Sequence, residues 1–198
     1  MLIDDIRNYK VYLVSKSPRR HELLSGMGIE FEYLATHVEE IYSDCLSPVE
    51  VAEYLSQLKL SPIDRILYPS NTIFIACDTI VVLEDKIIEK PKDELDAFRM
   101  LSELSGRKHV VISGLTVATP FQSITSHGKT EVIFKYFSEE ELQYYVARYK
   151  PLDKAGAYGV QEWIGYVGID SINGSFYNVM GLPTKLLWDI LAQLVRKH

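Results

Sequence analysis

The segment Val11-Tyr12-Leu13-Val14-Ser15-Lys16-Ser17-Pro18-Arg19-Arg20 joins an apolar run to the start of an amphipathic helix pattern. The run 11–14 is rich in β-prone residues, which predicts a short buried strand. Ser17 is a good N-cap and Pro18 suits the first helical position, so a helix is expected over 18–27. A strand followed directly by a helix favours an α/β fold.

Outward from this segment, helix signals recur along the chain. Capping boxes at Ser47 and Ser138 predict helices that run to Lys59 and through Val146. Asp93 caps a helix that is expected to end at Leu104, and a last helix starts near Pro183.

Strand signals lie between these helices and are followed in places by hairpin turns. The pattern predicts strands over 30–35, 73–77, 80–83, 86–89, 109–119, 130–136 and 164–172, with 122–130 as a polar connection. Asn173-Gly174 predicts a hairpin turn and a returning strand over 175–179. The whole indicates an α/β fold with a mixed sheet and flanking helices.

Composition bounds the class of protein. The 198 residues are 47% hydrophobic and carry a net charge of −6, which suits one globular domain over 1–198, with two lobes around a cleft as the alternative. The acidic balance argues against nucleic acid as a partner, and no apolar run reaches membrane-spanning length. Cys45 and Cys77 form no metal-ligand spacing, so a reducing cytoplasm is expected.

The turn 15–20 is a candidate site for a phosphorylated anion. Backbone N–H groups at a helix start and the positive end of the helix dipole favour negative charge, and Arg19 and Arg20 add two guanidinium groups. The alternative is a solvated helix start with incidental charge.

Carboxylates follow two of the predicted strands. Asp78 comes after the buried run 73–77, at the strand end where α/β proteins bind ligands, and Thr79 adds a hydroxyl. Such a carboxylate can hold a divalent cation or deprotonate water, although it can also cap backbone N–H groups. Glu40 offers a second carboxylate, with a solvated surface position as the alternative.

Three lysines are candidate phosphate-facing cations: Lys59, Lys90 and Lys154. The alternative for each is a solvent-facing charge, which is the usual state of a lysine. The block 153–161 combines small residues with one aromatic and one amide, which suits close approach to a ligand. The amide of Gln161 has a donor and an acceptor with which it could read a pyrimidine edge, or it could stabilise a tight turn.

Five ordered blocks together resemble the Maf family of nucleoside triphosphate pyrophosphatases. They are Ser15 to Arg20, Cys77-Asp78-Thr79, Glu89 to Asp93, Asp153 to Gln161, and Asn173-Gly174-Ser175 with Gly181-Leu182-Pro183. The fourth block, which ends at Gln161, resembles the branch of the family that acts on dTTP and UTP.

The resemblance implies a Maf/ITPase-like fold with a cleft between two lobes, and hydrolysis of a nucleoside triphosphate to the monophosphate and pyrophosphate. It also implies a divalent cation, Mg²⁺ or Mn²⁺, held by Asp78 and Glu40, with Asp78 as the catalytic base. By matching position, Arg19, Thr79 and Gln161 are expected to set substrate preference, and Arg20, Lys59 and Lys90 are expected to face the phosphates. Ser17 and Lys154 complete the expected substrate-binding residues.

The chain departs from the family pattern at Lys16, Leu60, Cys77 and Glu162. Glu162 stands where the family often has glycine, next to the residue that is expected to read the base. Two other functions stay open: a pyrophosphatase for purine or modified nucleotides, and a nucleotide-binding regulator of cell division without turnover. The resemblance also makes a homodimer plausible.

Overall fold

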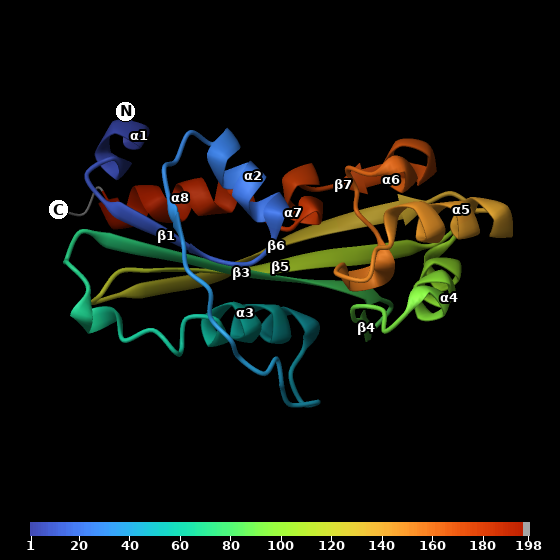
Figure 1. Ribbon diagram of the computed structural model, residues 1–198, viewed down its shortest axis with the longest axis horizontal. Coiled ribbons are helices and arrows are strands. Elements are labelled where there is room, and N and C mark those ends of the chain that lie inside the picture. Colours follow the sequence, from blue (N-terminus) through green and yellow to red (C-terminus); the bar gives the residue numbers. More distant parts are fainter. Residues whose placement is uncertain (196–198) are drawn as a thin grey trace. The chain divides into compact units, whose positions relative to one another are not determined.

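The computed structural model describes residues 1–195, and seven strands in this range form one sheet (Figure 1). The order is β2-β1-β3-β5-β6-β7, and β4 pairs with β3. The strands are β1 (Lys10–Val14), β2 (Glu32–Tyr33), β3 (Thr72–Leu83), β4 (Lys86–Ile88), β5 (Lys108–Ala118), β6 (Ser123–Phe134) and β7 (Ile169–Asn173). β1 is parallel to both β2 and β3. In contrast, β4 is antiparallel to β3, and β7 is antiparallel to β6. The predicted mixed α/β fold is confirmed.

The chain divides into two compact units. Unit 1 contains residues 1–78, 113–128 and the segment from Gly181 onward, and unit 2 contains 79–112 and 129–180. The strands β3, β5 and β6 each contribute residues to both units. The boundary on β3 falls between Asp78 and Thr79. The single domain over 1–198 stays a prediction.

Unit 1 places helices on both faces of its strands: α3 lies on one side and α8 on the other (Figure 1). Its helices are α1 (Leu2–Ile6), α2 (Pro18–Gly26), α3 (Pro48–Leu58), the 3₁₀ turn η1 (Arg65–Leu67) and α8 (Thr184–Val195). The predicted capping box starts α3, where Glu50 N–H donates to Ser47 Oγ and Ser47 N–H donates to the Glu50 carboxylate. A Cβ at Gly114 of β5 would lie 1.9 Å from the Ala52 carbonyl oxygen, so strand and helix backbones touch here.

Unit 2 contains the other parts of the long strands β3, β5 and β6, together with its own helices. These helices are α4 (Glu94–Leu104), α5 (Glu139–Tyr149), the 3₁₀ turn η2 (Ala155–Ala157), α6 (Trp163–Gly168) and α7 (Phe176–Met180). α4 contacts both α5 and η2. Caps at Asp93 and Ser138 start α4 and α5 as predicted. Large side chains that are almost completely buried include Leu101, Leu104, Phe134, Tyr145 and Ile164.

The carboxyl-terminal part of the predicted pattern is partly wrong. Residues 164–168 lie in α6 and only 169–173 form β7. Ile164 and Gly168, four residues apart, are buried while Tyr166 faces solvent, which is the periodicity of a helix and not of a strand. Gly174 does make a turn, with φ of +132°, but helix α7 follows it instead of a returning strand.

Three other strand boundaries differ from prediction. The predicted strands 73–77 and 80–83 form one continuous strand, β3, because the polar pair Asp78-Thr79 stays extended between them, so Asp78 lies within a strand and not at its end. The polar stretch 122–130 belongs mostly to β6, which is half-exposed there and so tolerates polar side chains. In the predicted strand 30–35, the strand β2 covers only Glu32 and Tyr33, and the Leu34 N–H adds one hydrogen bond to the Leu13 carbonyl of β1.

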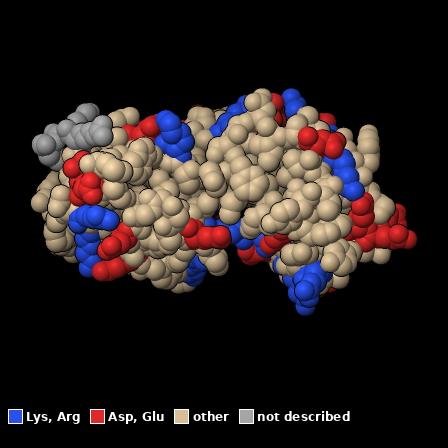
Figure 2. Space-filling view, turned by 90° about the horizontal axis from the view of Figure 1, so that it is seen from above, with Lys and Arg blue, Asp and Glu red and all other residues tan. Residues whose placement is uncertain are grey.

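Charges of both signs are mixed on the surface. On the face shown in Figure 2, acidic and basic side chains lie in small groups separated by uncharged surface. None of the helices within residues 1–195 has the length and apolar composition that spanning a membrane requires.

Candidate active site

The turn after β1 is organised by a serine hydroxyl. Ser17 stands at the N-cap of α2 and Pro18 at its first position, as predicted. Within the described residues, however, the Ser17 side chain makes no capping hydrogen bond. Its backbone N–H donates instead to Ser15 Oγ at 3.2 Å, and this hydroxyl also accepts from Arg20 Nη1 at 3.2 Å. The Ser15 side chain therefore connects the turn to α2, through the backbone of Ser17 and the side chain of Arg20.

Arg20 is held from a second direction by the segment before α8. Its Nε donates to the Gly181 carbonyl at 2.7 Å, and Cys77 Sγ donates to the same oxygen at 3.3 Å. One carbonyl thus connects α2 to β3 immediately before Asp78. The guanidinium of Arg20 is oriented by contacts at Nε and at Nη1. Arg19, its neighbour, is half-buried.

Three predicted residues meet at one charged group in unit 1. Lys59 Nζ lies 2.7 Å from Asp78 Oδ1 and 2.6 Å from Glu40 Oε1. The side chain of Lys59 is 13% exposed and that of Asp78 10%. Lys59 follows α3 directly, and its carbonyl accepts from Thr36 Oγ1 at 2.9 Å, on the loop that leads to Glu40. The two carboxylates converge on a single cationic atom.

The charge state of Lys59 follows from these contacts. Burial of the ammonium lowers its pKa, but the charges of Asp78 and Glu40 and the hydrogen bonds to them outweigh burial. The net effect raises the pKa of Lys59 above its ordinary value. The lysine therefore stays protonated at neutral pH and partly balances the two carboxylates.

Unit 2 holds the other predicted residues, Thr79, Lys90, Lys154 and Gln161. Thr79 follows Asp78 on β3, and Lys90 is exposed just beyond β4. The Gly156 N–H donates to the Glu89 carbonyl at 3.1 Å, which places the chain around Lys90 beside the block 153–161.

Lys154 and Gln161 have different surroundings within that block. The side chain of Lys154 is 8% exposed, and its Nζ lies 2.8 Å from Asp153 Oδ1 and 3.1 Å from Glu162 Oε1. Gln161 is half-buried, and its Oε1 is buried with no hydrogen-bond partner among residues 1–195. A buried carbonyl oxygen without a donor is costly, so this atom is suited to accept from a ligand.

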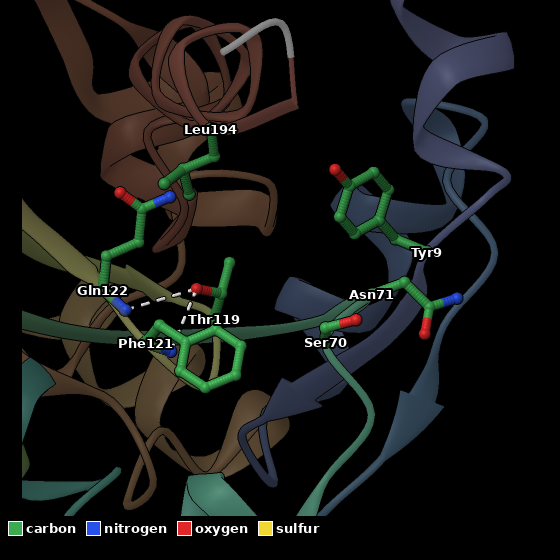
Figure 3. A pocket seen from close by; sticks show the side chains of 7 residues that line it. All are labelled: Tyr9, Ser70, Asn71, Thr119, Phe121, Gln122 and Leu194. Carbon is green, nitrogen blue, oxygen red and sulfur yellow. Dashed lines mark hydrogen bonds between the residues drawn. The ribbon is translucent and has the colours of Figure 1, made fainter. Parts of the chain in front are cut away.

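A pocket in unit 1 contains none of the predicted residues. It has a volume of about 490 Å³ and is lined by Tyr9, Ser70, Asn71, Thr119, Phe121, Gln122 and Leu194 (Figure 3). Thr119 Oγ1 accepts there from the N–H groups of Phe121 and Gln122. Tyr9 and Asn71 precede β1 and β3, whereas the turn 15–20 lies beyond the carboxyl end of β1. The pocket therefore lies at the opposite strand ends from the predicted phosphate site.

Sequence reasoning did not single out several residues that organise these groups. Ser15 and Gly181 stood inside the motif blocks. Ser15 contacts Arg20 from five residues away, whereas the contact of Gly181 with Arg20 spans 161 residues. Tyr145 is a buried residue of α5, and its hydroxyl contacts Glu162. A tyrosine at a core position was the available signal, since a buried hydroxyl needs a partner.

Comparisons with known proteins agree with the family resemblance of the five sequence blocks. The model of the Maf-like protein family matches residues 10–194. A dTTP/UTP pyrophosphatase of Porphyromonas gingivalis is 43% identical over 192 residues, which is 96% of each chain. One of Phocaeicola vulgatus is 43% identical over 194 residues, 98% of this chain and all of the relative.

Among solved structures, the Ham1 protein of Staphylococcus aureus is similar, with a TM-score of 0.51 and 15% identity over 93% of this chain and 99% of that one. At this identity the likeness concerns the fold alone. The family match, in contrast, extends over nearly the whole described sequence. This chain belongs to the Maf family.

Proposed function

We propose that this chain hydrolyses dTTP and UTP to the nucleoside monophosphate and pyrophosphate. The relatives from P. gingivalis and P. vulgatus carry the name dTTP/UTP pyrophosphatase and align over almost their full length. The observation that carries the proposal is the convergence of Asp78 and Glu40 on Lys59. It gathers a candidate base, a second carboxylate and a cation in one place.

The two carboxylates fit a divalent cation. Mg²⁺ commonly takes one or two protein carboxylates and completes its ligand set with water and substrate phosphates. No group of three or more His, Cys, Asp or Glu side chains suited to a metal occurs within the described residues. Asp78 and Glu40 would hold Mg²⁺ or Mn²⁺ together with the triphosphate. A bound divalent ion masks phosphate charge and stabilises charge on the leaving pyrophosphate.

The residues of this chain have distinct roles in the proposed reaction. Arg20, fixed by Ser15 and Gly181, presents an oriented guanidinium to the phosphates, and Arg19 adds a second one. Lys59 keeps its proton and balances charge beside Asp78. Asp78 accepts the proton of the attacking water as general base. Ser17, Thr79 and Lys90 complete the proposed substrate-binding set.

Gln161 is proposed to read the base. Uracil and thymine present an N–H donor between two carbonyl acceptors, and a side-chain amide can pair with both kinds of group. The buried Oε1 without a partner supports this role, since a nucleobase N–H would satisfy it.

A nucleotide panel with pyrophosphate detection tests the reaction and the base class together. Purified protein with Mn²⁺ or Mg²⁺ should release pyrophosphate from dTTP and UTP at higher kcat/KM than from CTP, GTP, ITP or methylated nucleotides. Preference for a purine would overturn the assignment of the base. Nucleotide binding without turnover would favour a regulatory protein.

The proposed compartment is the cytoplasm, where free nucleotides are present. Cys45 is exposed and unbridged, which suits a reducing environment. A homodimer is also proposed from the family resemblance, and the mass in solution, measured by light scattering, tests it.

A further inference from the structure

We infer that Glu162 is a positioning residue for base recognition: together with Tyr145 and Lys154 it clamps the turn that carries Gln161. The inference rests on the proposed function, because it assigns to these residues the task of aiming the amide that reads the pyrimidine. The contacts that carry it all lie within unit 2.

The carboxylate of Glu162 is held at both oxygens. The Tyr145 hydroxyl donates to Oε2, and Lys154 Nζ lies 3.1 Å from Oε1. Tyr145 is completely buried, and the side chains of Lys154 and Glu162 are 8% and 17% exposed. Charge-assisted contacts at this depth are stronger than the same contacts in water, so they restrict the carboxylate to one position.

The hydroxyl of Tyr145 extends the clamp to the backbone. It accepts from the Gly159 N–H at 3.0 Å while it donates to Glu162. The Glu162 N–H donates to the Gly159 carbonyl at 3.0 Å, so side-chain and backbone bonds close the turn 159–162 from both ends. Gln161 lies inside this turn, next to the clamped carboxylate.

The side chain of Glu162 does not cap the helix that Glu162 begins. It occupies the N-cap of α6, yet it makes no side-chain capping bond there within residues 1–195. N-cap side chains usually accept from the first turn of their helix. Here the carboxylate points back toward α5 and Lys154, which indicates that its task lies with the turn.

Lys154 also acquires a role from this arrangement. Its ammonium is paired with both Asp153 and Glu162 and is largely buried. We assign it to the clamp rather than to the phosphates. The positive charge compensates a carboxylate that would otherwise be buried beside a neutral hydroxyl.

Gly159 offers a way to displace the carboxylate without removing any functional group. A Cβ at this position would lie 2.8 Å from Glu162 Cδ and 3.0 Å from Oε2. These atoms form the far end of a flexible side chain, so Gly159→Ala should fold and push the carboxylate out of the clamp. The backbone at Gly159 is outside the left-handed region.

The experiment compares kcat/KM for UTP and for CTP in Glu162→Gln, Tyr145→Phe and Gly159→Ala. Each variant should lower the UTP-to-CTP ratio by about tenfold, mainly through a higher KM for UTP, because an amide that is aimed less well loses discrimination. Combining Gly159→Ala with Glu162→Gln should lower the ratio no further. The matched control is Tyr144→Phe, at a half-exposed neighbour that keeps its ring contact with Trp163.

Three outcomes separate the clamp from the proposed function. If Gln161→Ala lowers the ratio while folded Glu162→Gln and Tyr145→Phe keep the wild-type ratio, the clamp is wrong and the function stands. A loss of kcat for both nucleotides at an unchanged ratio also overturns the clamp, since it indicates a merely structural role. If the wild-type chain does not prefer UTP, the function and the clamp fail together.

Discussion

The contacts of Arg20 and Lys59 fix the positions of their positive charges. A surface lysine or arginine is a mobile, hydrated charge, whereas Arg20 is held through two of its nitrogens and Lys59 between two carboxylates. Fixing these groups before a ligand arrives reduces the entropy that binding must overcome. Preorganised charge is also the main means by which proteins stabilise phosphoryl-transfer transition states.

Replacing Asp78 with asparagine tests the proposed base. Asp78→Asn keeps the shape but cannot accept a proton, so kcat for UTP should fall by about 10² to 10⁴. Asp64→Asn, at an exposed position in the same unit, is the control and should keep wild-type turnover. Thermal unfolding of both variants shows whether they fold. Near-normal turnover by folded Asp78→Asn would refute the assigned role.

His109 predicts how stability depends on pH. It is buried in unit 2 and hydrogen-bonded to Tyr158 at 2.8 Å, and burial lowers its pKa to about 4. Between about pH 6.5 and about pH 4, His109 is protonated in the unfolded chain but not in the folded chain. The free energy of unfolding therefore decreases as the pH is lowered through this range.

The measurement compares wild type with His109→Gln, which removes the titration. Between pH 7.5 and 5.5 the unfolding free energy of wild type should fall by about 1 kcal/mol more than that of the variant. Chemical denaturation at both pH values gives the difference. Equal losses in the two proteins would show that His109 protonates as readily when folded.

At the scale of elements, close contact between α3 and β5 supports the loop that carries Lys59. Gly114 lets the strand touch the helix backbone at Ala52, and Ser56 on α3 hydrogen-bonds Thr116 at 2.7 Å. α3 ends at Leu58, so Lys59 extends from an element that is fixed along one face. The placement of Lys59 therefore depends on packing one turn earlier in the helix.

Gly114→Ala should destabilise the protein by about 2–3 kcal/mol, because the added methyl overlaps the Ala52 carbonyl. The control is Gly26→Ala at the end of α2, where a Cβ meets nothing within 4 Å. That change should be neutral or add about 0.5 kcal/mol, since alanine favours helix. Urea unfolding curves measure both. Equal stability of the two variants would contradict the close contact.

The sequence predicted elements well where the signal was local. The caps at Ser47, Asp93 and Ser138 depend on residues three positions apart, and all three helices start as expected. The run 164–168 misled because its apolar residues suit a strand, whereas its burial follows the period of a helix, with Ile164 and Gly168 buried and Tyr166 exposed. Tertiary burial overrides local preference in such segments.

At the scale of the whole molecule, the candidate site residues are far apart in the sequence and belong to two compact units. The five motif blocks allowed the candidate site residues to be named from the sequence, because the resemblance to the family covers almost the whole chain. The pairings of Arg20 with Gly181 and of Tyr145 with Glu162 could not be predicted, since they join segments with no local pattern between them.

The ion should bind together with the nucleotide. Only two carboxylates are proposed as protein ligands, so Mn²⁺ should bind at least about tenfold more tightly with a non-hydrolysable UTP analogue than without it. Titration calorimetry measures both affinities, and a chelator should abolish hydrolysis until Mn²⁺ is restored. Equal affinity with and without the analogue would point to a complete site made by protein groups alone.

The two cysteines give the protein an internal pair of chemical reporters. Cys45 is exposed, whereas Cys77 is completely buried one residue before Asp78 and hydrogen-bonded to Gly181. A thiol reagent should modify Cys45 at once and Cys77 only when this part of β3 opens. The delay between the two modifications therefore measures the rate at which β3 opens locally beside the proposed base. A bound nucleotide should lengthen this delay, and the measurement needs no engineered label.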